Sequence, residues 1–348
     1  MNLVGTTTRR FAAIGAVLAI VVSACSTAAT PAPAIPASAT PAPASSAPAA
    51  SQAAASPSAA SSAPCGTVNI AVNPWVGYRA DAAVVGYLLK NQLGCTVVDK
   101  NLDEQPSWQG FPTGEVDVIL ENWGHEDLAA KYITTDKVAQ DAGQTGNEGI
   151  IGWYVPKFFV DANPDILTAK TDPTVLNKYA AQFKTSESGD KGQLLDGATS
   201  FVTNDQGMIN GFGLNFKVVY SGSEAASNKA IQSAIDKQQP IIAYYYTPNW
   251  FSAKVDLVHI ELPAWTAGCD TNPKLIKCDY PPYHLNKVVS TKFATSGSPA
   301  YTLISKFNWT NDDQNLVASY IQSDNMSDDD AAKKWLDANT AKWQAWMP

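Results

Sequence analysis

Arginine is scarce in this sequence. Only Arg9, Arg10 and Arg79 occur among 348 residues, and without the first two the chain carries 22 basic and 32 acidic residues, a net charge of −10. Such a balance disfavours nucleic acid and anionic lipid as partners. Binding of phosphate, sulfate or a dicarboxylate usually needs a guanidinium fork or several cations. We therefore expect no nucleic-acid partner and a ligand that is not an anion of this kind.

Catalytic and metal-binding patterns are also missing. The three histidines, His125, His259 and His284, are scattered without the spacing of metal ligands. The sequence has neither a phosphate-binding glycine loop followed by Lys-Ser/Thr nor a Gly-x-Ser-x-Gly elbow. We expect no metal, no cofactor and no enzymatic activity. The alternative from another class is an exported carbohydrate-active enzyme with Glu121 and Glu126 as its carboxylate pair.

The amino-terminal residues have the layout of an export signal. Arg9 and Arg10 precede an apolar run over residues 11–22, which is too short for a comfortable membrane anchor. The ending Val-Ser-Ala-Cys resembles the bacterial lipobox, in which the cysteine becomes the lipid-modified first residue. We expect a signal peptide over residues 1–24 and lipidation at Cys25, with an ordinary cleaved signal as the alternative.

Residues 25–64 have the composition of a linker. From Ser26 to Pro64 the chain is almost entirely Ala, Pro, Ser and Thr, without a charge or an aromatic ring. Such a segment cannot bury enough apolar surface to offset the entropy of ordering. Proline-rich chain extends about 3.1 Å per residue, which gives a reach on the order of 100 Å. We expect a disordered, lipid-anchored linker that tethers an extracytoplasmic domain to the cell membrane.

Four cysteines remain after Cys25, namely Cys65, Cys95, Cys269 and Cys278. An even number in an exported domain indicates two disulfides, although four cysteines allow three connectivities. We favour Cys65–Cys95, because two expected neighbouring strands begin there, and Cys269–Cys278, which would close a short loop. Zinc binding is the alternative, but the spacing matches no common zinc motif.

Strands and helices alternate in the first part of the folded region. Strands are expected at residues 67–73, 96–101 and 114–123, with helices at 79–92 and 106–111 between them. This order predicts a parallel sheet with helices on its faces. Ligands bind beyond the carboxyl ends of the strands in such sheets. Trp75 and Trp123, which follow the first and third strands, should therefore lie at the binding edge.

The rest of the chain indicates a second α/β unit inserted into the first. Further strand signals lie at 152–159, 216–222, 240–248 and 255–263, with a helix at 223–237 and two terminal helices that begin near Thr310 and Ser327. We expect one lobe from residues 65–156 and 257–348 and a second lobe from residues 157–256. Two crossings between the lobes predict a hinge and a cleft.

Four stretches resemble a known family. They read PSWQGFPTGEVDVILENW, GWYVPKFFV, YYYTPNWFSAKVDLVHIELP and CDYPPYHLNKVVS, and they look like the glycine betaine/proline/choline substrate-binding proteins of ABC transporters. The resemblance implies an α/β, two-lobe periplasmic-binding-protein fold of type II, the Venus flytrap. It also implies a monomer that closes on a quaternary ammonium compound and delivers it to permease subunits. A ligand-sensing receptor domain of the same fold is the alternative.

Aromatic rings suit such a ligand physically. A trimethylammonium group has a permanent charge and no N–H donor, so a hydrogen bond or a salt-bridge fork cannot hold it. Aromatic faces offer negative quadrupole and apolar surface together, at about 0.5–2 kcal/mol per contact. Three or four such contacts would supply several of the roughly 8 kcal/mol that micromolar binding represents.

The resemblance implies an aromatic cage from both lobes. Trp75 and Trp123 match the family's tryptophans after the first and third strands, and Tyr154 lies in the crossover segment, where the family often has an aromatic residue. Tyr246 and Asn249 replace the tryptophan and histidine of the usual Gly-Trp-x-Pro-His pattern. These two changes affect the ligand's polar end more than its ammonium end.

Strand alternation separates the three consecutive tyrosines. Tyr244 and Tyr246 should face one side and Tyr245 the other. We expect Tyr246 to form a wall of the cage. The remaining tryptophans are expected to serve packing: Trp108, Trp250, Trp265, Trp335, Trp343 and Trp346.

Polar contacts are expected at two places. The backbone N–H groups of Val76 and Gly77, which open the first helix, could receive a ligand carboxylate. Asp205 and Asn210 lie where the family's second lobe approaches the ligand's polar group. Choline-specific relatives carry an aspartate where this chain has Gly77, which favours betaine-type zwitterions over choline.

Overall fold

The computed structural model describes residues 64–201 and 203–348. The signal peptide, Cys25 and all but the last residue of the linker, which are expected from the sequence, lie outside the described residues. Among the helices of the described part, none combines the length and the apolar character needed to cross a membrane.

The described residues contain nine strands, which connect in one sheet path of order β2-β1-β3-β9-β4-β7-β5-β6, with β8 paired to β4. Three parallel strands come first: β1 (Thr67–Val72), β2 (Thr96–Asn101) and β3 (Val118–Asn122). The parallel sheet expected from the strand–helix–strand order is thus confirmed. The return strand β9 (Tyr283–Ser290) runs antiparallel to β3 and to the long strand β4 (Ala139–Pro156).

Helices cover the faces of this first lobe. They are α1 (Val76–Leu93), α2 (Glu104–Thr113), α3 (Glu126–Ala129), the π-helical η1 (Ala130–Thr135), α8 (Thr291–Ala294), α9 (Pro299–Lys306), α10 (Asn311–Gln322), α11 (Asp328–Ala338) and α12 (Thr340–Gln344). The left-handed Gly94 ends α1 at φ 67°. The two terminal helices begin where they were expected: Ser327 caps α11 as predicted, and Thr310 caps α10. Both helices pack against α1.

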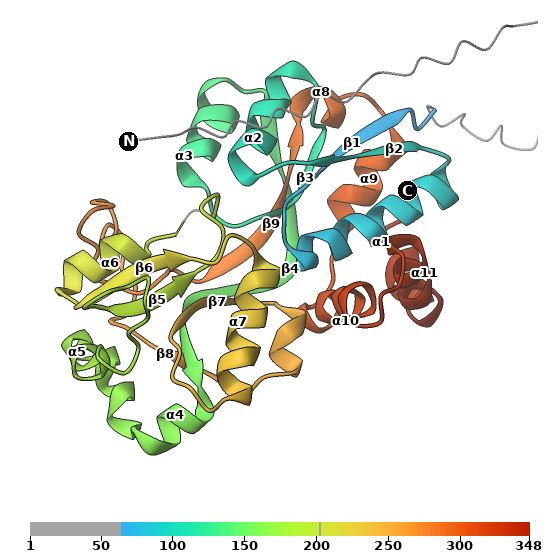
Figure 1. Cartoon of the computed structure of the whole chain (residues 1–348). Coiled ribbons are helices and arrows are strands. Elements are labelled where there is room, and N and C mark those ends of the chain that lie inside the picture. The colour runs from blue at the N-terminus through green and yellow to red at the C-terminus, as the bar shows by residue number, and fades with distance from the viewer. Residues whose placement is uncertain (1–63, 202) are drawn as a thin grey trace, which may run out of the picture. The chain divides into compact units, whose positions relative to one another are not determined.

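The second lobe is built on the last part of β4. Its residues 150–156 pair with β7 (Ala243–Thr247) and β8 (Leu257–Ile260), and β5 (Gly192–Asp196) lies between β7 and β6 (Phe216–Tyr220). Its helices are α4 (Lys157–Ala162), α5 (Leu176–Tyr179), α6 (Asp205–Phe212), α7 (Glu224–Asp236) and the 3₁₀ segments η2 (Pro164–Lys170), η3 (Pro173–Val175) and η4 (Trp250–Ala253). Figure 1 shows β5, β6, α6 and α7 grouped apart from β1, β2 and α1, with β4 and β9 running between the groups.

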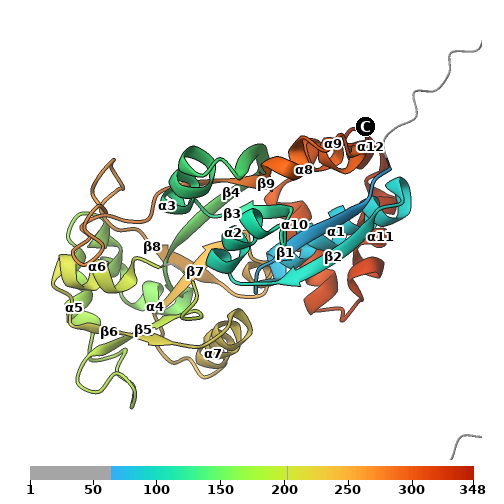
Figure 2. The same ribbon diagram turned by 90° about the horizontal axis from the view of Figure 1, so that it is seen from above.

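Two expected boundaries differ from the structure. The segment expected as a strand over 152–159 ends at Pro156, because a helix begins at Lys157. The chain returns to the first lobe later than residue 257. β8 pairs with the second-lobe end of β4, and Tyr280 donates its hydroxyl hydrogen bond to Asp205 on α6 at 2.7 Å. Residues 257–282 therefore belong with the second lobe, and β9 makes the return; both views show this arrangement (Figures 1 and 2).

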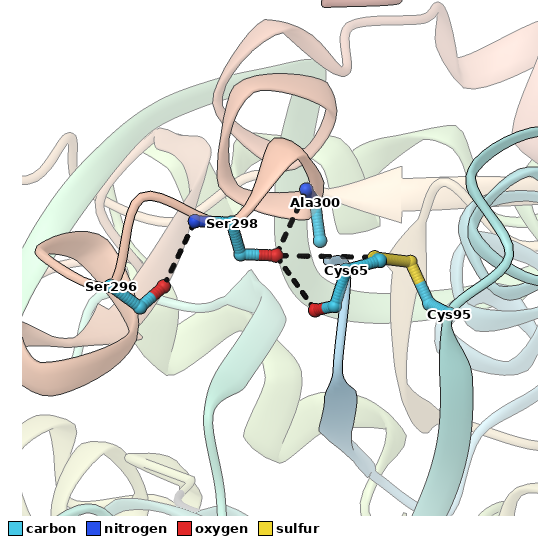
Figure 3. Close-up of a disulfide and its surroundings, with 5 residues drawn as sticks. All are labelled: Cys65, Cys95, Ser296, Ser298 and Ala300. Carbon is cyan, nitrogen blue, oxygen red and sulfur yellow. Dashed lines mark hydrogen bonds between the residues drawn. A yellow bond between two sulfur atoms is a disulfide. The ribbon is translucent and has the colours of Figure 1, made fainter. Parts of the chain in front are cut away.

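Both expected disulfides are present, as Cys65–Cys95 and Cys269–Cys278. The first joins the beginnings of β1 and β2. Figure 3 shows how Ser298, the amino-terminal cap of α9, also holds this point: its hydroxyl donates to the Cys65 carbonyl at 2.9 Å and accepts from the Ala300 N–H at 3.3 Å. The beginning of the described chain is thereby fixed to a neighbouring strand and to a helix.

Candidate ligand-binding site

A cavity of 820 Å³ lies between the two lobes. Pockets for small molecules usually measure about 300–1,000 Å³. The first lobe contributes Trp75 and Trp123, from the loops after β1 and β3. The second lobe contributes Tyr244 and Tyr246 on β7. The carboxyl ends of the parallel strands thus provide one wall, as expected, and the antiparallel β7 provides the other.

The two tryptophans are held by one buried carboxylate. The indole N–H groups of Trp75 and Trp123 donate to the same oxygen, Glu121 Oε1, at 2.9 and 2.7 Å. Gln314 on α10 donates to Glu121 Oε2 at 2.6 Å. Glu121 itself lies in β3 and is only 2% exposed. With both oxygens occupied, Glu121 serves to orient the rings and is not placed as one of a pair of accessible catalytic carboxylates.

The aromatic rings meet at steep angles, like the walls of a box. Trp75 and Phe201 have centroids 5.9 Å apart and planes at 87°, and Trp123 and Tyr246 have centroids 5.6 Å apart and planes at 78°. Both pairs join residues of different lobes. The ring centroid of Tyr283, at the start of β9, lies 5.7 Å from that of Trp123. Rings at such angles can present a face to a compact cation, as a cation–π contact requires.

Strand alternation places the tyrosines of β7 as expected. Tyr244 and Tyr246 line the cavity, whereas Tyr245 packs in a separate hydrophobic cluster behind the strand. Tyr154 belongs to that second cluster, where it stacks on His259 at 4.8 Å, and it does not line the cavity. The register explains this: Tyr154 stands opposite Ala243, whose side chain points away from the cavity.

The wall of the cavity carries negative charge. Glu104, Glu126, Asp127 and Asp270 line it, and no lysine or arginine of the described residues does. His125 Nε2 lies 2.7 Å from Glu104 Oε1. Burial alone would lower the pKa of His125, but the hydrogen bond and the charge of Glu104 outweigh burial and raise this pKa. The cavity is therefore suited to a cation.

A second buried carboxylate connects the lobes behind the aromatic wall. Glu224, the first residue of α7, accepts a hydrogen bond from the Val76 N–H at 2.8 Å and another from the Asn249 side chain at 3.1 Å. Burial raises the pKa of Glu224, an effect that the Val76 hydrogen bond opposes. The neighbouring Tyr246 hydroxyl is buried beside Glu224, and its proximity also opposes the rise in the pKa of Glu224; no atom among the described residues meets this hydroxyl in full hydrogen-bond geometry. Burial, and next the charge of Glu224, raise the pKa of Tyr246 well above its ordinary value.

The other expected polar contacts lie outside the cavity. Asp205 is fully buried and accepts hydrogen bonds from Trp153 at 2.8 Å and Tyr280 at 2.7 Å, while Asn210 is exposed on α6. Gly77 packs over Gln314, whose Nε2 would lie 3.0 Å from a Cβ at that position. The cavity therefore brings together Trp75, Trp123 and Tyr246 of the expected site residues, and their ligand contacts stay predictions.

Sequence reasoning missed several cavity residues. Tyr244, Phe201 and Tyr283 were not singled out, and Trp265, which was expected to serve packing alone, also lines the cavity. Alternation along β7 was the available signal for Tyr244. Phe201 and Trp265 come from loops, so neither strand nor helix periodicity could have indicated them.

Comparison with known proteins decides the family. The chain matches OpuAC, the substrate-binding domain of the ABC-type glycine betaine transport system, over residues 66–338. The chain belongs to this family. OpuAC proteins are solute-binding proteins that bind small quaternary ammonium ligands outside the cytoplasm and act with ABC permeases, and this chain is accordingly the substrate-binding component of an ABC importer.

Individual relatives agree with the OpuAC assignment. A trimethylamine N-oxide-binding protein from Pelagibacter ubique is 27% identical over 286 residues, which cover 79% of this chain and 88% of the relative. The closed, liganded structure of a lactococcal OpuAC with glycine betaine has a TM-score of 0.61 at 20% identity, covering 81% of this chain and 100% of that one. The structure of a choline-binding protein in complex with choline has a TM-score of 0.65 at 18% identity, and the match covers 81% of this chain and 91% of that one. At these identities the two structures show the shared fold, the two-lobe architecture of type II periplasmic binding proteins.

Proposed function

We propose that this protein captures a methylated ammonium compound between Trp75, Trp123 and Tyr246 and releases it to the permease of its importer. The observation that carries the proposal is the cavity itself, with aromatic rings from both lobes and an acidic wall. A permanent methylated cation gains from ring faces and from negative surroundings together. An anion would be repelled by the acidic wall.

The same proposal covers how the protein works in the cell. It acts as a monomer without catalysing a reaction, and a lipid on Cys25 holds it at the outer face of the cell membrane. The Val-Ser-Ala-Cys ending and the uncharged linker of residues 25–64 support the anchor. The full engagement of Glu121 by Trp75, Trp123 and Gln314 supports binding rather than carboxylate catalysis.

Calorimetry with tetramethylammonium tests the cage directly, because this probe has a methylated cation and no polar end. We expect saturable binding to the wild-type protein. Trp123→Leu should weaken it about tenfold or more, since a desolvated cation–π contact is worth about 2 kcal/mol. Trp123→Phe, which retains an aromatic face, should lose less.

The matched control is Trp343→Ala, because Trp343 lies on α12 and does not line the cavity. Its affinity should equal that of the wild type. Equal binding by Trp123→Leu and the wild type, or a response only to sugars or inorganic anions, would contradict the proposal.

A further inference from the structure

The amino terminus of α1 carries a carboxylate from the opposite lobe. Trp75 occupies the cap position of α1, but its side chain makes no capping hydrogen bond to the helix, and the first turn has no acidic residue. Glu224 of α7 fills this role instead, through the 2.8 Å hydrogen bond from the Val76 N–H. A helix amino terminus favours one negative charge at this place.

Glu224 also accepts a hydrogen bond from Asn249, a second donor that could otherwise bind a ligand carboxylate. The Asn249 side chain donates to Glu224 Oε1 at 3.1 Å, while its own oxygen accepts from the Phe251 N–H at 3.0 Å. Asn249 is 2% exposed and Glu224 is 5% exposed, so this arrangement is enclosed by protein. The chain thus supplies its own anion to the group of donors that the sequence suggested for a ligand's carboxylate.

The two histidines that line the cavity are already paired with carboxylates, His125 with Glu104 and His284 with Glu148, so neither is free to compensate a ligand's carboxylate. No lysine or arginine of the described residues lines the cavity. Arg79 lies on the outer face of α1, half-exposed, in a 2.8 Å ion pair with Asp328. The acidic wall and the buried Glu121 add further repulsion of an anion.

A single oxygen, by contrast, has a partner. The Tyr246 ring lines the aromatic wall, while its buried hydroxyl lies beside Glu224, lowers the pKa of that carboxyl and meets no atom of the residues described in full hydrogen-bond geometry. This hydroxyl can donate to an N-oxide oxygen, or accept from a hydroxyl group. An unpaired buried hydroxyl is unfavourable, so a ligand that pairs it gains binding free energy.

We propose that Glu224 makes this site selective for methylated ammonium compounds whose polar end is one oxygen, a hydroxyl or an N-oxide, and disfavours those that carry a carboxylate. This rests on the proposed function, since it concerns the polar end of the ligand that the cage holds. It reverses the preference for betaine-type zwitterions that Gly77 suggested from the sequence.

Calorimetry with four probes tests the proposal: tetramethylammonium, choline, trimethylamine N-oxide and glycine betaine. For the wild type we expect glycine betaine to bind at least about tenfold more weakly than the better of choline and the N-oxide, a tenfold ratio being the smallest that resolves a charge effect clearly. Which of these two binds more tightly identifies the oxygen that the site prefers. In Glu224→Gln the ratio between the dissociation constant of glycine betaine and that of the better of choline and the N-oxide should fall about tenfold.

Tetramethylammonium, which has no polar end, reports whether each variant keeps an intact cage, and Glu224→Ala provides a second variant. The matched control is Glu187→Gln, which removes one exposed carboxylate of the second lobe that does not line the cavity and should leave the ratio unchanged.

The outcomes separate the two proposals. If tetramethylammonium binds and glycine betaine binds the wild type as tightly as choline and the N-oxide, the selectivity proposal is overturned while the cage stands. The role of Glu224 is equally overturned if the preference exists but persists in Glu224→Gln and Glu224→Ala. If tetramethylammonium fails to bind the wild type, the proposed function itself is wrong and the selectivity falls with it.

Discussion

At the scale of single residues, the site depends on side chains that do not line the cavity themselves. Glu121 accepts hydrogen bonds from two indoles that come from different loops, and Gln314 fixes the carboxylate from α10. Gln314 in turn accepts from Asn147 on β4 at 3.1 Å. The orientation of the two tryptophans is thus set by a buried polar network that reaches from α10 to β4.

Glu121→Gln tests this network. The two indoles and Gln314 all donate hydrogen bonds to Glu121. The side-chain amide that this substitution introduces would place its own N–H groups against one of these donors, so at least one hydrogen bond must be lost. We expect the free energy of unfolding to fall by roughly 1–3 kcal/mol. The affinity for tetramethylammonium should fall as well, because the rings lose their common anchor. Urea denaturation and calorimetry measure the two effects.

Glu126→Gln is the control for Glu121→Gln, since Glu126 is exposed and should change the free energy of unfolding by less than about 0.5 kcal/mol. If both variants unfold at the same urea concentration, Glu121 does not hold the indoles in the way described.

The sequence indicated part of this site, for reasons visible in individual residues. Trp75 and Trp123 could be placed because each follows a parallel strand, where position along the chain predicts position in the fold. Glu121 could not be assigned its role, because its partners Trp75 and Gln314 are distant in sequence. Tyr154 was predicted to face the cavity but does not line it. Which face of β4 points into the cavity depends on its register with β7, and this pairing of distant segments cannot be read from the sequence.

At the scale of elements, the loop between β8 and β9 is part of the second lobe. The Cys269–Cys278 disulfide closes part of it, and the Ile276 N–H donates to the Gly207 carbonyl on α6 at 2.9 Å. Gly211 lies where the loop backbone comes closest to α6: a Cβ there would be 1.9 Å from the Ile276 carbonyl oxygen. The loop carries Trp265 to the cavity, so its docking on α6 affects the site.

Gly211→Ala should separate the loop from α6. Backbone atoms cannot give way as a flexible side chain can, so we expect a loss of roughly 1–3 kcal/mol in the free energy of unfolding, the usual effect of overpacking. Weaker ligand binding should accompany it, because Trp265 moves with the loop. Thermal unfolding and calorimetry provide the measurements.

Gly86→Ala is the matched control on α1, where a Cβ would make an ordinary 3.7 Å contact with Val97. It should stabilise the protein by about 0.5–1 kcal/mol, because alanine favours a helix. A stable Gly211→Ala variant with wild-type affinity would show that the loop does not need this close approach.

Strand and helix positions were largely predictable, whereas the lobe boundary was not. The strand at residues 96–101 has the predicted bounds, the two terminal helices begin near Thr310 and Ser327 as predicted, and Ser327 caps its helix as its side chain suggested. The assignment of residues 257–282 depended on the pairing of β8 with β4 and on the contact of Tyr280 with Asp205. Both are contacts between distant parts of the chain, which local patterns do not encode.

At the scale of the whole molecule, capture must take place next to a permease while the binding lobes stay free to reorient. We propose that Cys25 carries a lipid and that this lipid and the linker of residues 25–64 meet this need together. The prediction is that Cys25→Ser, expressed in a bacterium that processes lipoproteins, moves the protein from the membrane fraction to the medium or periplasm. Fractionation with immunoblotting measures this.

The affinity of purified Cys25→Ser for tetramethylammonium should match that of the wild type, because residue 25 precedes the substrate-binding domain that matches over residues 66–338. Retention of Cys25→Ser in the membrane fraction would show that the anchor lies elsewhere.

The long strand β4 has a consequence for engineering. It pairs with β9 in the first lobe and with β7 and β8 in the second, so one continuous segment is common to both. The halves are therefore not autonomous modules. A fragment limited to residues 157–282 would leave two strand edges bare, and such edges promote association between chains. Chimeras that exchange one half between homologues to alter ligand preference must transfer this strand together with its partners.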